Sequence, residues 1–341
     1  MRVGSVRLRS YALVLAAALA GCGGAGSLPA QNGAPDGSQI ARSHGGSYMA
    51  KHFARQWLLY VSNRNGIVNV YEYWQHALVG VLTNFEQPAG ACTGNSGEVY
   101  IVDYQAKTIS EFAHGGTKPL QVIQDSYQPL ACSVDLTTGD LAVANYGETY
   151  ANGGPAYEGD GNLAIYTHGK GKPTYYGTRD DHFSACAYDD RGDLLAASSN
   201  GYSGYYYGDF AYLPKKSKSI IAMNLPGPNS SSSWNWGFVD GIAYDGKNWI
   251  VDDYALYRYK INIKAQYIDT IKLTGGSGAG GIAVYRRTPK SPGTQFVSAI
   301  GYNSETTDVG YWKYPAGGAP YYEITSNLDQ PDGVAISRRQ K

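Results

Sequence analysis

One sequence motif recurs along the chain: a short run of small apolar residues, a polar turn, and a second apolar run that ends in Asp, Asn or Ser. It is clearest at residues 185–198 (ACAYDDRGDLLAAS). Counting that segment, the motif occurs six times. We call its copies anchors, and they begin at Gly90, Ala131, Ala185, Gly241, Gly281 and Gly333. Neighbouring anchors lie 40 to 56 residues apart. A repeat of this length, built from short strands and polar turns, predicts a β-propeller.

Each repeat contains four short strands. The unit from Gly90 to Asp125 shows them as GACT, EVYIVD, TISEFAHG and PLQVIQD. The last anchor, GVAIS at 333–337, supplies an innermost strand alone, whereas the opening unit, which starts with LLYVSN at 58–63, lacks one. We therefore predict an all-β fold over residues 57–341: a six-bladed β-propeller of four-stranded antiparallel blades, with the last blade closed by strands from both chain ends.

The first residues have the features of an export signal. Arg2, Arg7 and Arg9 precede an apolar stretch, YALVLAAALA at 11–20, that is too short to span a bilayer comfortably. The following Cys22, in LAGC, resembles the lipobox of bacterial lipoproteins. This resemblance implies a signal peptide over 1–21, a lipidated Cys22, and a protein of the bacterial cell envelope, periplasmic or surface-exposed. Residues 22–56, which are rich in Gly, Ala, Ser and Pro, are predicted to form a flexible tether.

Composition narrows the partners. The formal net charge is zero and only 16% of residues are charged, against about 25% in a typical chain. Without a basic patch, nucleic acid is not an expected partner. We expect a monomeric domain that meets the membrane only through its lipid anchor.

Three cysteines, Cys92, Cys132 and Cys186, fall in the first strand of a repeat. An odd number leaves at least one of them unpaired within the propeller. The first strand of each repeat is the crowded innermost one, where Cys fits as a small apolar residue. We therefore expect buried thiols rather than a disulfide.

The phrases GIAYDGKNWIVDD (241–253), ACAYDDRGDLLAAS (185–198) and QPDGVAIS (330–337) resemble NHL-repeat propellers and their six-bladed relatives of the senescence marker protein/gluconolactonase family. That family binds one divalent cation in the central channel. The resemblance implies that Asp240 and Asp332 are metal ligands of a lactonase-type hydrolase. Each of them directly precedes the glycine that begins the first strand of a repeat. The sequence departs from the family's pattern in one respect: Ala89 and Leu130 occupy the early-blade positions where a further metal ligand is expected. The alternative is that both Asp residues cap the turn into the strand.

A single histidine stands near the predicted channel mouth. His182 follows two aspartates, and it could act as a general base that a carboxylate orients. The alternative is an ordinary loop residue.

Two predicted loops are unusually long and rich in tyrosine. The segment 145–162 carries Tyr146, Tyr150 and Tyr157, and the segment 200–219 carries Tyr202, Tyr205, Tyr206, Tyr207 and Tyr212. Both interrupt neighbouring repeats after the second strand, so we expect them side by side at the channel mouth. Long loops in compact domains are usually functional or disordered, and Tyr among Gly and Ser forms good contact surfaces. The leading hypothesis is a propeller that binds a protein or saccharide without a cofactor. The alternative for the loops is a lid packed on the propeller's own rim.

Overall fold

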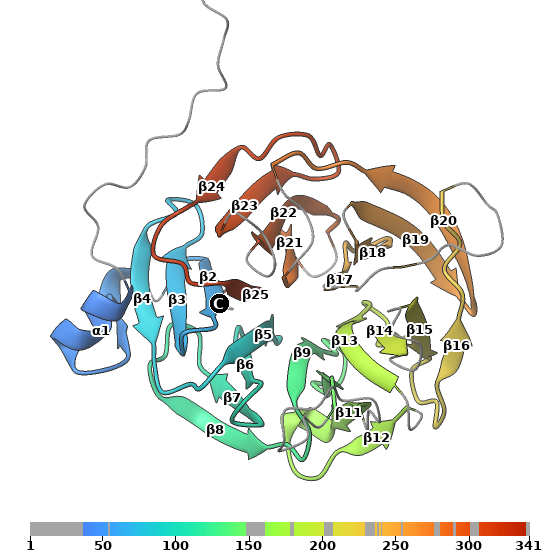
Figure 1. The fold of residues 1–341 in the computed structure, drawn as a ribbon, viewed down its shortest axis with the longest axis horizontal. Helices are drawn as coiled ribbons and strands as arrows, with labels where there is room; N and C mark the ends of the chain where they lie inside the picture. Colours follow the sequence, from blue (N-terminus) through green and yellow to red (C-terminus); the bar gives the residue numbers. More distant parts are fainter. Residues whose placement is uncertain are drawn as a thin grey trace, which may run out of the picture.

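The structure is a computed structural model that describes residues 37–53, 55–147, 161–177, 181–200, 207–228, 236, 239, 241–253, 255–275, 280–288, 291–300 and 307–338. In this part of the chain, six antiparallel sheets stand around a common axis as the blades of a propeller (Figure 1). The predicted six-bladed fold is confirmed. We name the blades A to F in chain order, and the strands of each blade a to d from the axis outward.

Five blades are built from consecutive strands. Blade B contains β5 (Pro88–Thr93), β6 (Val99–Asp103), β7 (Thr108–Phe112) and β8 (Pro119–Gln124). Blade C contains β9 (Pro129–Val134), β10 (Leu141–Asn145), β11 (Asn162–Tyr166) and β12 (Thr174–Tyr176), with a 3-10 turn at Thr167–Gly169. Blade D contains β13 (Asp181–Tyr188), β14 (Leu194–Asn200), β15 (Tyr207–Leu213) and β16 (Ile221–Met223). Blade E contains β17 (Gly241–Tyr244), β18 (Trp249–Asp252), β19 (Leu256–Asn262) and β20 (Lys264–Ile271). Blade F contains β21 (Ile282–Arg286), β22 (Gly293–Ile300), β23 (Asp308–Lys313) and β24 (Tyr322–Ile324).

Blade A joins the two ends of the propeller sequence. Its strand a is the last strand of the chain, and it pairs antiparallel with the first strand of the opening repeat, so that Leu58 faces Ser337 and Ser62 faces Gly333. The blade contains β25 (Pro331–Ser337), β2 (Leu58–Asn63), β3 (Ile67–Glu72) and β4 (Leu78–Leu82). The predicted closure by strands from both ends is therefore present.

Blade A also carries an extra edge that differs from the sequence-based expectation. The short strand β1 (Tyr48–Met49) pairs with β4, next to the helix α1 (Gly37–His44) and a 3-10 turn at Lys51–Phe53. Part of the predicted tether thus packs on the propeller, and ordered structure begins before Trp57. An open strand edge explains this, because β1 satisfies backbone groups of β4 that would otherwise remain unpaired. None of the helices in the described ranges is long and apolar enough to cross a membrane.

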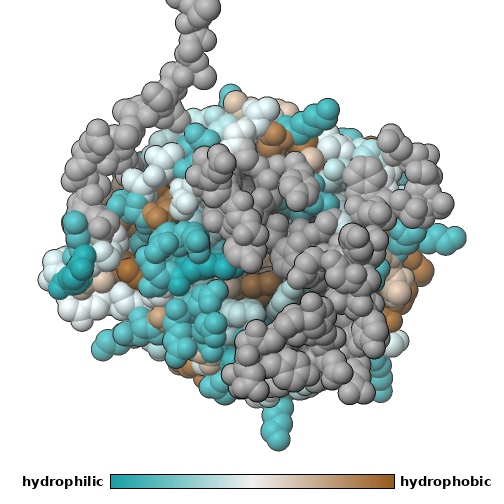
Figure 2. Space-filling model, viewed as in Figure 1, coloured by the Kyte–Doolittle hydropathy of each residue, from teal (hydrophilic) through white to brown (hydrophobic). Residues whose placement is uncertain are grey.

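The hydrophobic core lies between the blades. Successive side chains of a strand point to opposite faces, so in β2 Leu58 and Tyr60 pack toward blade B, while Leu59 and Val61 pack toward blade F. Across the described residues, six such clusters follow one another around the ring. Both faces of the inner strands are therefore apolar, whereas hydrophilic residues gather over the β2–β7 part of the ring on the face seen in Figure 2.

Blade D corrects one predicted loop. The segment 200–219 was expected to be a single long connection, but its middle forms β15, in which Tyr207 pairs with Asn200 of β14. This strand was not predicted because it begins with polar residues, among them Gly208 and Asp209, that lack the apolar alternation typical of a strand. Its second half carries the apolar alternation, because Phe210 and Tyr212 both pack into the core between blades D and E.

Candidate functional site

The connections between strands b and c and between strands d and a emerge on one side of the ring, which we call the b–c face. The opposite side, where the turns between strands a and b lie, is the a–b face. On the b–c face, β10 ends at Asn145 and β11 begins at Asn162, while β14 ends at Asn200 and β15 begins at Tyr207. Blades C and D are neighbours, and β10 contacts β13. The two tyrosine-rich segments are thus anchored on adjacent blades at the same face.

Most of the predicted tyrosines of these segments lie outside the described residues: Tyr150, Tyr157, Tyr202, Tyr205 and Tyr206. The side chain of Tyr207 lies outside them too, although its backbone belongs to β15. Tyr212 corrects the prediction. Its ring is only 2% exposed, and its hydroxyl donates to Asp193 at 2.9 Å. Burial raises the pKa of this hydroxyl, and the side chain belongs to the core rather than to a contact surface.

Tyr146, at the start of the segment 145–162, lies against His182. Nδ1 of His182 shares a hydrogen bond with the carbonyl oxygen of Tyr146, and the two rings lie 5.0 Å apart. The Tyr146 N–H donates to the carbonyl oxygen of Gln128 at 2.9 Å. His182 itself lies in β13 and is 4% exposed. A buried ring bonded to the backbone holds Tyr146 in place, which favours a structural role for His182 over general-base catalysis.

The predicted metal ligands receive little support. Asp240 lies outside the described residues. Asp332, at the start of β25, accepts a hydrogen bond from Nε of Arg64 at 3.1 Å, and its side chain is 12% exposed. Burial raises the pKa of Asp332, and the Arg64 guanidinium opposes that rise. In the part of the chain that the structure describes, no group of three or more His, Cys, Asp or Glu side chains could hold a metal ion.

The cysteines contradict the sequence-based expectation in part. Cys92 of β5 and Cys132 of β9 form a disulfide, with their Cα atoms 5.6 Å apart. The expectation of buried thiols was wrong for this pair, because strands a of adjacent blades lie next to each other around the axis and bring the two side chains within bridging distance. Cys186, by contrast, is a free, buried thiol as expected, and burial raises its pKa to about 12.

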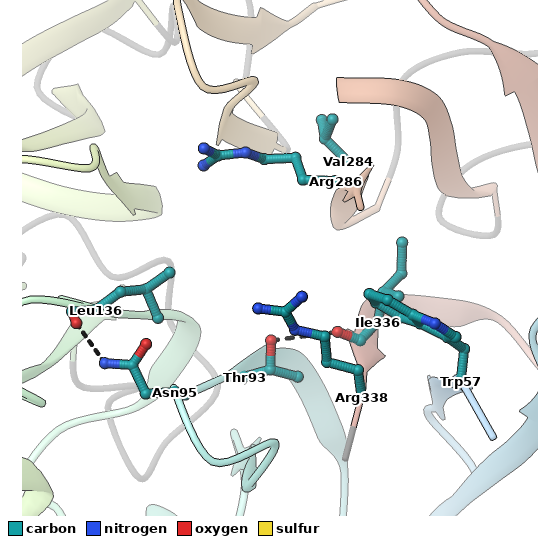
Figure 3. A pocket seen from close by; sticks show the side chains of 9 residues that line it. Trp57, Thr93, Asn95, Leu136, Val284, Arg286, Ile336 and Arg338 are labelled. Carbon is teal, nitrogen blue, oxygen red and sulfur yellow. Dashed lines mark hydrogen bonds between the residues drawn. The ribbon is translucent and has the colours of Figure 1, made fainter. Parts of the chain in front are cut away.

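The described residues line a cavity on the a–b face, which the sequence analysis did not anticipate (Figure 3). Its volume is about 580 Å³, including space open to solvent. Arg286, at the end of β21, and Arg338, just after β25, extend into it, and the indole of Trp57 lies beside Arg338 (Figure 3). One signal was available: the final two anchors are followed by Arg-Arg at 286–287 and 338–339.

Five residues after the anchor, where the last two repeats have Arg286 and Arg338, the middle repeats carry Leu136, Asp190 and Gly246, and each of these follows an Asp. Asp135, Asp189 and Asp245 each accept hydrogen bonds from backbone N–H groups of their own turn. The last two repeats have Tyr285 and Ser337 in place of this capping Asp, and an arginine follows each of them.

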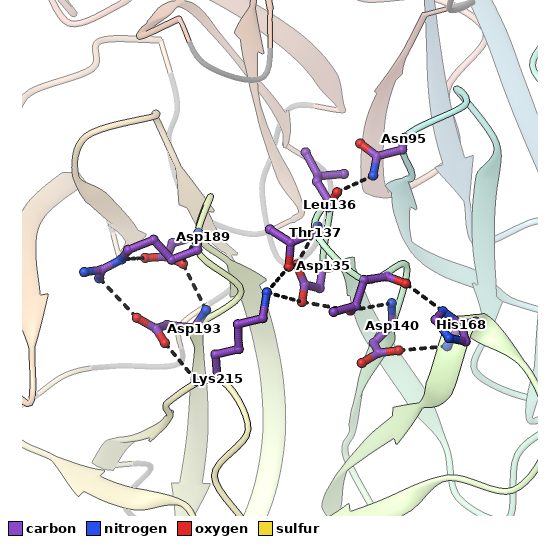
Figure 4. Close-up of polar contacts among 11 residues, drawn as sticks. Asn95, Asp135, Leu136, Thr137, Asp140, His168, Asp189, Asp193 and Lys215 are labelled. Atoms are coloured by element: carbon purple, nitrogen blue, oxygen red, sulfur yellow. Dashed lines mark hydrogen bonds and ion pairs between the residues drawn. The ribbon is translucent and has the colours of Figure 1, made fainter.

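The a–b turns next to the cavity are tied to one another (Figure 4). The amide nitrogen of Asn95, in the blade B turn, donates to the carbonyl oxygen of Leu136 in the blade C turn. Lys215 of blade D donates to Thr137 of blade C, and its Nζ lies 3.9 Å from Asp135. These contacts between blades hold one wall of the cavity in place.

Solved structures share this fold. A chain from a nidogen/laminin complex is 11% identical, with a TM-score of 0.59, covering 84% of this chain and 100% of that one. Hydrazine synthase of Kuenenia stuttgartiensis is 12% identical, with a TM-score of 0.55 and coverage of 79% and 83%. The Cps50 (Swd1) β-propeller domain of Myceliophteria thermophila is 8% identical, with a TM-score of 0.54 and coverage of 85% and 89%. At these identities the likeness shows the propeller fold alone. No protein-family model and no curated protein matches the chain.

Proposed function

We propose that this protein is a membrane-anchored propeller of the bacterial cell envelope that binds a protein partner through its b–c face. The observation that carries the proposal is the common anchoring of the two tyrosine-rich segments, which leave adjacent blades at one face. A rigid propeller that presents variable connections is a frequent arrangement for binding, and Tyr supplies a large contact area at low entropic cost. Similar propellers include a chain of a nidogen/laminin complex.

The proposed location rests on the sequence of the first 22 residues and on the disulfide. Structural disulfides persist in oxidising compartments such as the periplasm and the cell surface. The Cys92–Cys132 bridge therefore supports export. In this proposal Cys22 carries the lipid, and residues 23–36 connect the anchor to the part of the chain that packs on blade A.

The contact residues in this proposal are Tyr146, Tyr150, Tyr157, Tyr202, Tyr205, Tyr206 and Tyr207. The hydrolase hypothesis needs oxygen ligands that converge on a cation. Asp332 already has a cationic partner in Arg64, so a metal would have to displace it. We therefore favour binding over lactone hydrolysis, and the likeness to a chain from a nidogen/laminin complex leads us to favour a protein over a saccharide.

Site-specific photocrosslinking in intact cells tests the proposal. A photoreactive phenylalanine at Tyr205 should give a discrete protein adduct, whereas the same group at Val122 should give none. Val122 is the matched control because it is 55% exposed on β8, at the outer rim of blade B. Adducts at neither position, or equal adducts at both, would contradict the proposal. Glycan-array binding that is lost on Tyr205→Ala would transfer the same surface to a saccharide ligand.

A further inference from the structure

The cavity on the a–b face contains a guanidinium that no carboxylate of the described residues neutralises. Nη1 of Arg338 donates to the carbonyl oxygen of Arg287 at 3.0 Å, and its guanidinium carbon lies 5.6 Å from the centre of the Trp57 ring. None of the ion pairs among the described residues includes Arg338. Since an arginine has five N–H donors, one backbone bond leaves most of them for another partner.

The second arginine of the cavity is differently engaged. Arg286 donates through both Nη atoms to Asp190, at 2.7 and 2.6 Å, and through Nε to the carbonyl oxygen of Ser291. It reaches blade D by passing over Gly246 of blade E, where a Cβ would lie 2.8 Å from Nη2. Its charge is therefore compensated within the chain, and Arg286 serves as part of the wall.

Arg338 is held in position by the closure of the ring. The Ser337 hydroxyl donates to the carbonyl oxygen of Gly97 at 2.6 Å. Gly97 has a φ of +86° and a Cβ there would lie 2.0 Å from the carbonyl oxygen of Arg338. The backbone of Arg338 thus packs directly against the blade B turn. A binding group fixed in this way loses less entropy when it takes a ligand.

The rest of the cavity is largely apolar near this guanidinium. Trp57, Val284 and Ile336 line it, together with Leu136 across the opening (Figure 3). The acidic side chain on the adjoining turn, Glu98, accepts the Ser96 N–H at 2.8 Å. A planar guanidinium pairs with a carboxylate through two parallel hydrogen bonds, and the apolar surface suits a hydrocarbon body.

We propose that this cavity binds small organic monocarboxylates, with the carboxylate on Arg338 and the apolar body against Trp57 and its neighbours. This site is on the opposite face from the proposed protein-binding surface and does not depend on it. Inorganic phosphate meets the guanidinium but lacks the apolar body. A neutral amide of the same shape has the apolar body but lacks the charge.

Calorimetric titration of the full chain with benzoate, benzamide and inorganic phosphate tests this proposal, with saturation-transfer NMR as a second readout. We expect saturable benzoate binding at roughly millimolar concentration, and binding at least about tenfold weaker for benzamide and phosphate. Arg338→Gln should weaken benzoate binding by about tenfold or more. Arg287→Gln is the matched control, because it removes an exposed arginine side chain that does not line the cavity.

Several results would overturn the proposal: no saturable benzoate binding, equal binding of benzoate and benzamide, equal binding of benzoate and phosphate, or equal losses in Arg338→Gln and Arg287→Gln. If Arg338→Gln melts early, Arg338→Lys keeps the charge while removing the planar fork. An intermediate loss of benzoate affinity in that variant supports the proposal, and unchanged affinity refutes it.

Discussion

The disulfide between Cys92 and Cys132 joins strands a of blades B and C, and it offers a quantitative test of the fold. Replacing both cysteines with Ala removes the bridge without placing a polar group in a crowded position. Cys132 is 8% exposed and packs in the core between these blades. The main expected effect is that the unfolded chain gains freedom, because the bridge no longer restrains it.

The magnitude follows from the separation of 40 residues between the two cysteines. Loop-closure entropy for that length is about 13 cal/mol/K, which corresponds to about 4 kcal/mol at 25 °C. The unfolding entropy of a propeller of about 285 residues is roughly 0.6 kcal/mol/K. The double variant should therefore melt about 7 °C below the oxidised protein.

Thermal melts followed by tryptophan fluorescence measure this difference, and a reductant should leave the melting temperature of the double variant unchanged. Alkylation of the denatured protein without reductant, followed by peptide mass mapping, should label Cys186 and leave Cys92 and Cys132 linked to each other. Alkylation of all three in the exported protein, or a double variant that melts within about 1 °C of the oxidised protein, would refute the reasoning.

Three further predictions concern charged groups. Asp190→Asn leaves Arg286, 12% exposed, without its carboxylate. It should cost about 2 kcal/mol in a denaturant titration, and an unchanged midpoint would count against the pair. His76 stacks on Tyr322, and burial lowers its pKa from 6.5 to about 4, so its share of the stability is present above pH 6.5 and lost as the pH falls toward 4. His76→Asn should therefore reduce the loss of unfolding free energy in that pH range by an amount on the order of 1 kcal/mol after allowance for solvent screening. Melting temperatures measured against pH should show a shallower fall in the variant, and an unaltered pH profile would contradict this. Calcium, magnesium, manganese or zinc should leave the melting temperature unchanged, whereas a rise of about 4 °C, as expected for saturating ligand, reversed by EDTA and absent in Asp332→Ala, would favour the hydrolase hypothesis.

The repeat pattern was sufficient to predict the blades and their closure. An innermost strand such as β5 or β25 needs small residues and a glycine where neighbouring backbones approach closely. A Cβ on Gly333 would lie 2.2 Å from the carbonyl oxygen of Ala89, and one on Gly90 would lie 2.6 Å from that of Leu130. The same requirement recurs at the start of strand a in every blade, where Gly or Ala meets it, so it leaves a periodic trace in the sequence.

Features that occur at only one place in the ring leave no such trace. The Cys92–Cys132 bridge depends on the distance between two strands of different sheets. The strand β1 forms because β4 offers an open edge that two residues can cover. The cavity around Arg338 is assembled from four blades, and its two arginines occupy a position that holds Leu136, Asp190 or Gly246 in the middle repeats. In β15 a polar first half concealed a strand whose second half alone alternates.

The central claim is that the tyrosine-rich face binds a partner, and the most direct measurement is the affinity of the partner identified by crosslinking. We would compare the wild type, Tyr205→Ala/Tyr206→Ala and the rim control Val122→Ser in a calorimetric or surface-based titration. The proposal predicts that the double variant binds about 30-fold or more weakly, as for loss of an interface hot spot of about 2 kcal/mol. The rim variant should bind normally, and all three proteins should melt at the same temperature. Unchanged affinity in the double variant would contradict the claim.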